Sequence, residues 1–228
     1  MNRSIRGYST FTRRNWQLPI SRLGDAGLAA IWVILAFSSI RITIEEAGEE
    51  SVMASAHHAV SALILCICAV LFIIRKPAIS RSSSPLANVI AVAGSWLMPV
   101  LIMQPLTSES NWLLTMTTSG LVLTHLTVFW SLFTLRRSFS IFPEARALIR
   151  TGPYALVRHP LYAAYFAMYP CFLLPRLSVW TLLVTVLGVA CELIRARDEE
   201  AVLQAAFPDY FDYAATTPKF FPRLSLAR

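Results

Sequence analysis

Charge is scarce in this sequence of 228 residues. Only 14% of the residues are charged, whereas 56% are hydrophobic. A typical soluble domain is about 25% charged. A single soluble core of this length could not hide so much apolar surface. The composition therefore excludes an ordinary soluble domain. It predicts an integral membrane protein, with the lipid bilayer as a binding partner.

Lysine and glycine are scarce as well. Twenty basic residues give a net charge of +7, yet only Lys76 and Lys219 are lysines. No long basic stripe with interleaved aromatics occurs, so we expect no nucleic-acid partner and assign the excess base to anionic lipid. With eight glycines and no Gly-x-Gly, collagen-like repeats are excluded. No apolar run precedes Leu23, so a cleavable signal peptide is not expected.

Uncharged stretches predict the membrane spans. Four of them, within residues 23–135, are long enough to cross a bilayer as helices, which takes about 20 residues each. Two shorter stretches follow, with Pro170 and Pro175 in the first. They predict a short helical hairpin over about residues 160–194. The expected fold is all-α and polytopic: a basic segment over 1–22, spans over 23–135, and a C-terminal region over 136–228 with the hairpin, a further helix and a tail.

Loop charges predict the topology, because basic loops stay on the cytoplasmic side. The N-terminal segment is basic, the first loop holds four glutamates, and the second holds Arg75, Lys76 and Arg81. The third loop has only Glu109, whereas the fourth contains five arginines. We therefore expect a multi-pass protein with cytoplasmic N- and C-termini.

The fourth loop also contains an unusual motif. It reads Gly152-Pro153-Tyr154, then Arg158-His159-Pro160-Leu161-Tyr162. Gly-Pro predicts a turn, and Pro160 suits the first position of a helix, where its missing N–H costs nothing. Arg158 and His159 would then lie near a helix N-terminus, which favours an anion such as a carboxylate. A membrane-anchoring loop with interfacial tyrosines is the simpler alternative for each residue taken alone.

A second cluster follows the hairpin. On a continuing helix Glu192, Arg195 and Glu199 share one face, because they are three and four residues apart. A salt-bridged surface helix would produce the same pattern and would contribute only a few tenths of a kcal/mol. The position of the cluster, directly after a short hairpin, brings it opposite the first motif.

Together the two clusters resemble the isoprenylcysteine carboxyl methyltransferases and the related phospholipid methyltransferases, which are membrane enzymes that use S-adenosyl-L-methionine (SAM). The resemblance extends from about residue 135 to residue 222. It rests on the following residues: Gly152-Pro153-Tyr154, Arg158-His159-Pro160 with Tyr162, Arg195, Glu199-Glu200, Phe207, Tyr210, Tyr213 and Pro218 to Pro222. Ala164 and Pro208 depart from the family pattern, which often has glycine at both places.

The resemblance implies a site for the cofactor SAM and no metal. It places Glu199 at the cofactor's amino group and Arg195, the expected catalytic residue, at the methyl acceptor. The other residues that it implies for cofactor binding are Arg146, Ala147, Leu148, Ile149, Tyr154, Arg158, His159, Pro160, Leu161 and Tyr162. The absence of Gly-x-Gly agrees, because the fingerprint of Rossmann-type methyltransferases is missing. The further helix beyond the hairpin would thus be a cytoplasmic cofactor-binding helix.

The sequence leaves the acceptor open. A carboxylate needs no base, only orientation by a bidentate arginine such as Arg195, and predicts carboxyl O-methylation of a prenylated or lipid-like molecule. A lipid amine would need a carboxylate such as Glu192 or Glu200; a small thiol or a lipid phosphate is also possible. A non-catalytic scaffold or transport subunit would predict ionisable groups inside the spans, where His125 is one candidate.

Overall fold

The computed structural model describes residues 18–46, 52–102, 104–108 and 110–223. Most of the basic segment expected over residues 1–22 lies outside these ranges, as do Glu49 and Glu50 of the predicted acidic loop.

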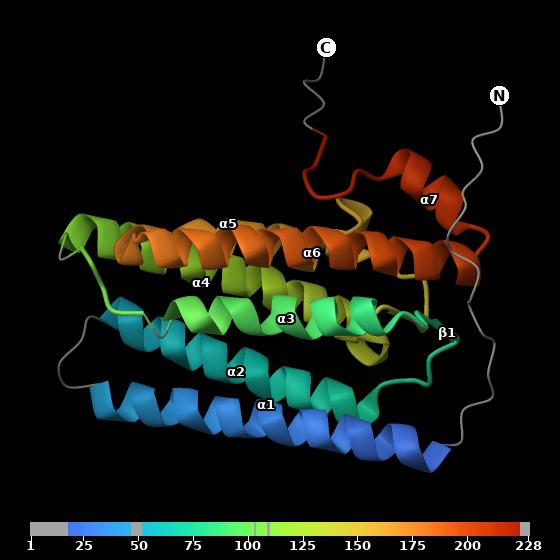
Figure 1. The fold of residues 1–228 in the computed structure, drawn as a ribbon, viewed down its shortest axis with the longest axis horizontal. Helices are drawn as coiled ribbons and strands as arrows, with labels where there is room; N and C mark the ends of the chain where they lie inside the picture. Colours follow the sequence, from blue (N-terminus) through green and yellow to red (C-terminus); the bar gives the residue numbers. More distant parts are fainter. Residues whose placement is uncertain (1–17, 47–51, 103, 109, 224–228) are drawn as a thin grey trace.

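The described residues are mostly helical, in agreement with the predicted all-α class (Figure 1). The α-helices are α1 (Leu18–Glu46), α2 (Val52–Ile74), α3 (Pro85–Ile102), α4 (Asn111–Leu135), α5 (Pro160–Leu173), α6 (Val179–Ala206) and α7 (Tyr210–Thr216). Short 3₁₀ helices are η1 (Arg136–Ser138), η2 (Gly152–Ala155) and η3 (Leu174–Arg176). Two short strands, β1 (Ser80–Arg81) and β2 (Glu144–Ala145), pair antiparallel.

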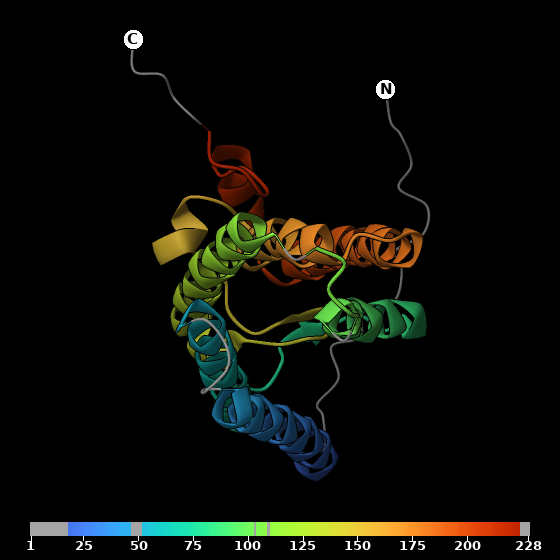
Figure 2. The same cartoon turned by 90° about the vertical axis from the view of Figure 1, so that its left-hand side faces the viewer.

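Helices α1 to α6 run side by side with alternating directions, and Figure 2 shows them in an open arc. Helix α1 packs on α2, α2 on α4, α4 on α5, and α6 on α3. The buried core between them includes Phe72, Leu101, Leu132 and Tyr169. Because the arc folds back on itself, α3 and α6 become neighbours although the sequence separates them by two helices.

Two helical segments in the described part of the chain are long and apolar enough to cross a membrane, Asn111–Ser138 and Val179–Ala206. Shorter apolar helical stretches are Ala29–Arg41, Ala59–Ile74 and Pro85–Leu101. The four full spans expected before residue 136 are thus not confirmed. Large apolar side chains such as Phe37, Ile73, Leu123 and Val179 are exposed, as expected for surfaces that face lipid.

Helix α6 contains both the second arm of the predicted hairpin and the charged helix expected after it. Helix α6 does not end at the first charges after Cys191 but continues to Ala206. It begins with a capping box, in which the Ser178 and Thr181 side chains and backbone N–H groups bond reciprocally. Its charged residues Glu192 and Arg195 are paired with each other inside the protein, so they do not interrupt the helix. The second arm of the expected hairpin and the expected further helix are therefore one continuous helix, α6.

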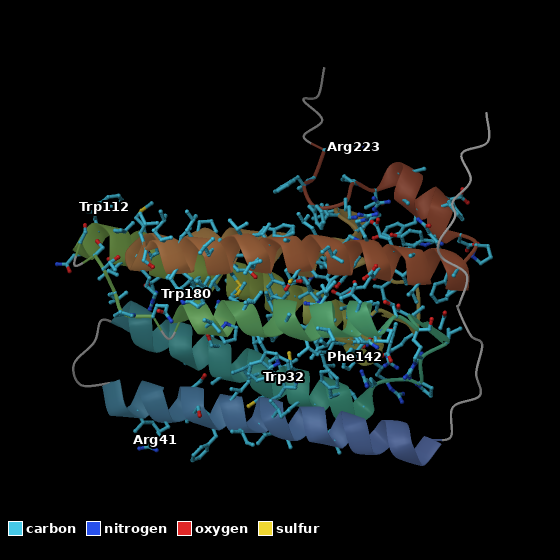
Figure 3. All side chains as sticks on the ribbon, in the orientation of Figure 1. Trp32, Arg41, Trp112, Phe142, Trp180 and Arg223 are labelled. Atoms are coloured by element: carbon cyan, nitrogen blue, oxygen red, sulfur yellow. The ribbon has the colours of Figure 1, made fainter. Side chains whose placement is uncertain are left out.

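Strands β1 and β2, η2 and α7 gather at one end of the bundle (Figure 1). Trp112 and Trp180 lie at the opposite end (Figure 3), and both are largely exposed. Amphipathic tryptophans at a bundle end are typical of a membrane–water interface. The motif residues and the interfacial tryptophans therefore occupy opposite ends of the bundle.

Candidate active site

The Gly-Pro-Tyr motif forms η2 and the Arg-His-Pro motif forms the start of α5, and residues of both lie at the site. Gly152 has φ of +58°, a left-handed conformation that favours glycine, and a Cβ there would lie 2.9 Å from the Thr134 Oγ1. Helix α5 begins at Pro160 with His159 as its N-cap residue, as the motif predicts. The tail returns over this turn, since the backbone N–H groups of Arg158 and His159 donate to the carbonyls of Pro218 and Lys219.

Helix α7 is fixed to the same turn by a tyrosine. The Tyr213 hydroxyl donates a hydrogen bond of 2.6 Å to the Tyr154 carbonyl. Burial raises the pKa of Tyr213 to about 12, and burial together with the nearby Glu199 raises the pKa of Tyr154 well above its ordinary value. Both phenols therefore stay neutral at physiological pH, and Tyr213 remains a hydrogen-bond donor.

Helix α6 contributes the charged face predicted from the spacing. Arg195 is buried, and its Nη1 donates to both oxygens of Glu192 at 3.1 and 2.9 Å. Its Nη2 donates to the Ile141 carbonyl at 3.1 Å, and its guanidinium lies 5.3 Å from the centre of the Tyr162 ring. The Arg195 Nε is buried and has no hydrogen-bond partner among the described residues. The three hydrogen bonds thus leave the Nε–H and one N–H of Nη2 unused.

Glu199 lies one turn further along α6, beside the start of α5. Its Oε1 accepts a hydrogen bond from the Tyr162 hydroxyl, and its Oε2 lies 3.9 Å from the His159 Nδ1. About a quarter of the Glu199 side chain is exposed. This carboxylate is therefore oriented by a phenol and still accessible to a cation.

Glu200 engages the cations that the sequence assigned to an incoming anion. Its Oε1 lies 3.0 Å from the His159 Nε2 and 3.3 Å from the Arg158 Nη2, and its Oε2 lies 3.1 Å from the Lys219 Nζ. The structure thus supplies an internal carboxylate for Arg158 and His159. The Arg158 Nε is nevertheless buried without a hydrogen-bond partner in the described part of the chain.

Glu144 is the centre of a charge cluster that the sequence did not reveal. Its carboxylate pairs with Arg146, with Arg81 at 3.2 Å and with Arg75 at 3.7 Å, and it accepts a hydrogen bond of 2.7 Å from Ser140. The arginines come from two loops that pair as β1 and β2. No spacing in the sequence brings these loops together, because residue 81 and residue 144 are separated by two helices.

A cavity of about 560 Å³ joins these groups. Of the residues expected to bind cofactor or acceptor, all but Pro160 line it: Arg146, Ala147, Leu148, Ile149, Tyr154, Arg158, His159, Leu161, Tyr162, Arg195 and Glu199. Pro160 is buried at the first position of α5 instead. The cavity continues between the helices past Trp32, Leu35, Met98 and Val128. It thus combines a polar end and an apolar interior.

Several lining residues were not among the predicted site residues. Glu192 was predicted on the charged face of the helix and as a possible base, but not among the site residues, although a charge within an apolar helical stretch indicates a buried partner. Tyr165 and Gly94 also line the cavity, and nothing in their sequence surroundings distinguishes them. His125 lines the apolar part, where its Nε2 lies 3.1 Å from the Ser61 hydroxyl and its Nδ1 2.6 Å from the Leu121 carbonyl. The bond to Ser61 links α4 to α2, whereas the bond to Leu121 lies within α4.

A family model described as phospholipid methyltransferase matches residues 111–210. This match confirms the resemblance inferred from the motifs, and it indicates a methyltransferase and a membrane location. It extends from the start of α4 to the start of α7 and therefore leaves out α1, α2 and α3.

Two curated proteins match a shorter part of the chain. One is the nickel-cobalt-cadmium resistance protein NccN of Alcaligenes xylosoxydans xylosoxydans, 39% identical over 88 residues, which cover 37% of this chain and 40% of that protein. The other is the cobalt-zinc-cadmium resistance protein CzcN of Cupriavidus metallidurans, 40% identical over 89 residues, which cover 36% and 38%. The chain thus spans about two fifths of the length of these relatives. Its described residues contain no group of three or more His, Cys, Asp or Glu side chains able to hold a metal ion.

Proposed function

We propose that this chain transfers a methyl group from SAM to the carboxylate of a lipid-like or prenylated acceptor at the cytoplasmic face of a membrane. The observation that carries the proposal is the buried Arg195, whose Nε has no partner among the described residues and whose cavity also holds Glu199. An arginine with a spare buried donor favours an anionic ligand. The apolar continuation of the same cavity suits a hydrocarbon tail.

The charges around the polar end fit SAM. When bound, SAM supplies an electrophilic methyl group. Glu199 is oriented by Tyr162 and would hold the ammonium group. Arg158, which lines the same cavity, would face the carboxylate, while residues 146–149 would line the remaining wall through their backbone. This division of roles is supported by the fact that Arg158 and Glu199 both line the cavity.

The acceptor would be oriented by Arg195. Glu192 already receives two hydrogen bonds from this arginine, so it is less suited to take a proton from an amine. A carboxylate acceptor carries no proton to remove at neutral pH, and its reaction needs orientation and exclusion of water. The buried position of Arg195 supports such exclusion.

The arrangement of helices supports the proposed topology. Successive helices α1 to α6 alternate in direction, so the start of α1 and helix α7 lie at the same end of the bundle (Figure 1). That end contains Arg75, Arg81, Arg146, Arg150 and Arg158. Because basic residues remain on the cytoplasmic side, we place this end and both termini in the cytoplasm. The protein would then be multi-pass, with α5, at 14 residues, too short to cross the bilayer alone.

A lipid amine is the second candidate acceptor. The description of the matching family, phospholipid methyltransferase, favours it. An amine must lose a proton before it attacks, and Glu192 or Glu200 would have to serve as the base. The two acceptors therefore differ in whether the reaction depends on the positive charge and fork geometry of Arg195.

Labelled SAM tests the proposal directly. Native membranes that contain the wild-type chain are incubated with SAM labelled in the methyl group, and label is followed into lipid, protein and volatile products. Membranes with the Glu199→Ala variant are the control. We expect base-labile label, as a methyl ester gives, in a lipid-like or prenylated fraction with the wild type only. Label in a base-stable lipid amine would support the second candidate, and equal labelling by both proteins would contradict the site.

A further inference from the structure

Arg195 is held from two directions, by its own helix and by helix α3. On α6, Glu192 accepts both bonds from Nη1. Across from it, Gly94 of α3 lines the same cavity. A Cβ at Gly94 would lie 3.2 Å from the Arg195 Cδ, 3.2 Å from the Glu192 Oε1 and 3.3 Å from the Cys191 Cβ. Helix α3 therefore approaches the ion pair as closely as a residue without a side chain permits.

We infer that Gly94 and Glu192 are positioning residues that fix the guanidinium of Arg195 at the acceptor end of the cavity. The inference rests on the proposed methyl transfer to a carboxylate, and it concerns two residues to which that proposal gives no contact with acceptor or cofactor. Glu192 fixes the direction of Nη1, and the Ile141 carbonyl fixes Nη2. The plane of the guanidinium is thereby held in one orientation at the wall of the cavity.

The lack of space for a side chain at position 94 explains the role of Gly94. Contacts of 3.2 to 3.3 Å are tighter than ordinary van der Waals contacts, so an added methyl group must displace a neighbour. The Cys191 Cβ belongs to the helix itself and moves little, whereas the Arg195 stem and the Glu192 carboxylate can rotate. A methyl group at position 94 would thus shift the arginine and not the helix. Gly94 lies outside the family match at residues 111–210, so α3 adds a constraint that this match does not contain.

The substitution Gly94→Ala should impair turnover of the acceptor without impairing SAM binding. Glu199 lies one turn beyond Arg195 and is oriented by Tyr162 from α5, not by α3. Displacement of Arg195 should therefore leave cofactor binding intact. A misplacement of about 1 Å can lower a rate by about 100-fold, so the loss in acceptor turnover should be large relative to any change in stability.

The test compares Gly94→Ala and Glu192→Gln with Gly27→Ala. Gly27 is a helical glycine at which an added Cβ would meet no other atom within 4 Å, so it receives the same substitution without a contact. Each full-length variant is purified in detergent. SAM affinity is measured by equilibrium binding, and methyl transfer is measured with N-acetyl-S-farnesylcysteine as the acceptor probe. The reaction of Arg195 with phenylglyoxal is followed by peptide mass spectrometry.

We expect Gly94→Ala and Glu192→Gln to raise the acceptor KM or lower kcat by about tenfold or more, with SAM affinity within about twofold of wild type. Arg195 should react with phenylglyoxal several-fold faster in both. Gly27→Ala should match the wild type throughout. Unchanged turnover and unchanged Arg195 reactivity in Gly94→Ala would overturn the inference. A parallel loss of SAM affinity and turnover would also overturn it, because it would indicate general packing.

The phenylglyoxal measurement separates this inference from the proposed function. If the wild type does not methylate the probe, a prenylcysteine carboxylate is not its acceptor. The reactivity of Arg195 in the three variants still decides whether Gly94 and Glu192 hold its guanidinium, because that reaction needs no acceptor.

Discussion

The Tyr162 hydroxyl donates a hydrogen bond to the carboxylate of Glu199. Tyr162 belongs to the first turn of α5, and Glu199 lies near the end of α6. This bond joins the Arg-His-Pro motif to the charged helix face and orients the carboxylate toward the cavity that both residues line. Two segments that were recognised separately in the sequence thus form one site.

Replacement of Glu199 by Ala should weaken SAM binding. A hydrogen bond to a charged group is worth about 1.5–3 kcal/mol, so we expect a loss of affinity of roughly 10- to 100-fold. Equilibrium binding in detergent measures it. Asp198→Ala is the matched control, because Asp198 is the neighbouring acid and does not line the cavity. Equal affinity in wild type and Glu199→Ala would remove Glu199 from the site.

Replacement of Arg195 by Lys should separate the candidate acceptors. Lysine keeps the charge but loses the planar fork that binds a carboxylate bidentately. We expect turnover of a prenylated carboxylate to fall by about 100-fold, with a much smaller effect on an amine or thiol. Labelled product is quantified for each acceptor class. Arg197→Lys, at an exposed position of the same helix, should be silent, and a silent Arg195→Lys would exclude an anionic acceptor held by this residue.

Tyr213→Phe tests the attachment of α7 and has a defined pH dependence. Loss of the bond to the Tyr154 carbonyl should lower the free energy of unfolding by about 1 kcal/mol. The folded pKa of Tyr213, about 12, exceeds the unfolded value of about 10. Its stabilising contribution is therefore complete below pH 10 and is lost as the pH rises toward 12.

The difference in stability between wild type and Tyr213→Phe should consequently shrink between about pH 10 and about pH 12. Thermal unfolding in detergent at several pH values measures this difference. A difference that stays constant or grows over that range would contradict a buried, neutral donor at position 213.

A double substitution tests the packing of α5 against α6. The Tyr169 hydroxyl is buried, has no hydrogen-bond partner among the described residues, and lies against Gly188, where a Cβ would overlap it. We expect Tyr169→Phe to be neutral or stabilising, because it removes an unsatisfied group. Gly188→Ala should destabilise by about 1–3 kcal/mol through overpacking.

Combining both changes should recover only part of the loss caused by Gly188→Ala, because the hydroxyl overlap is removed while the ring carbons at 2.6 and 2.8 Å remain. The free energies of unfolding of the four proteins form a double-mutant cycle. Additive effects would show that the Tyr169 hydroxyl and position 188 are not in contact.

Local chemistry explains which features the sequence predicts. The start of α5 at Pro160 follows from the fixed φ and missing N–H of proline, and the turn at Gly152 follows from a positive φ. The shared face of Glu192, Arg195 and Glu199 follows from helical spacing alone. The same spacing requires the helix to continue beyond Cys191, and α6 does extend to Ala206. In the folded protein Glu192 and Arg195 neutralise each other and the helix continues.

The sequence by itself determined the helical class, the membrane character and the residues of the two motifs, because these depend on composition and on contacts within one turn. Only the tertiary structure decided the partners of those residues. Glu200 rather than a ligand pairs with Arg158 and His159, Glu144 gathers three arginines from two distant loops, and α3 brings Gly94 against the Arg195 ion pair. Apart from the Glu144–Arg146 pair, each contact joins residues far apart in the chain, and the packing of helices and loops sets such distances.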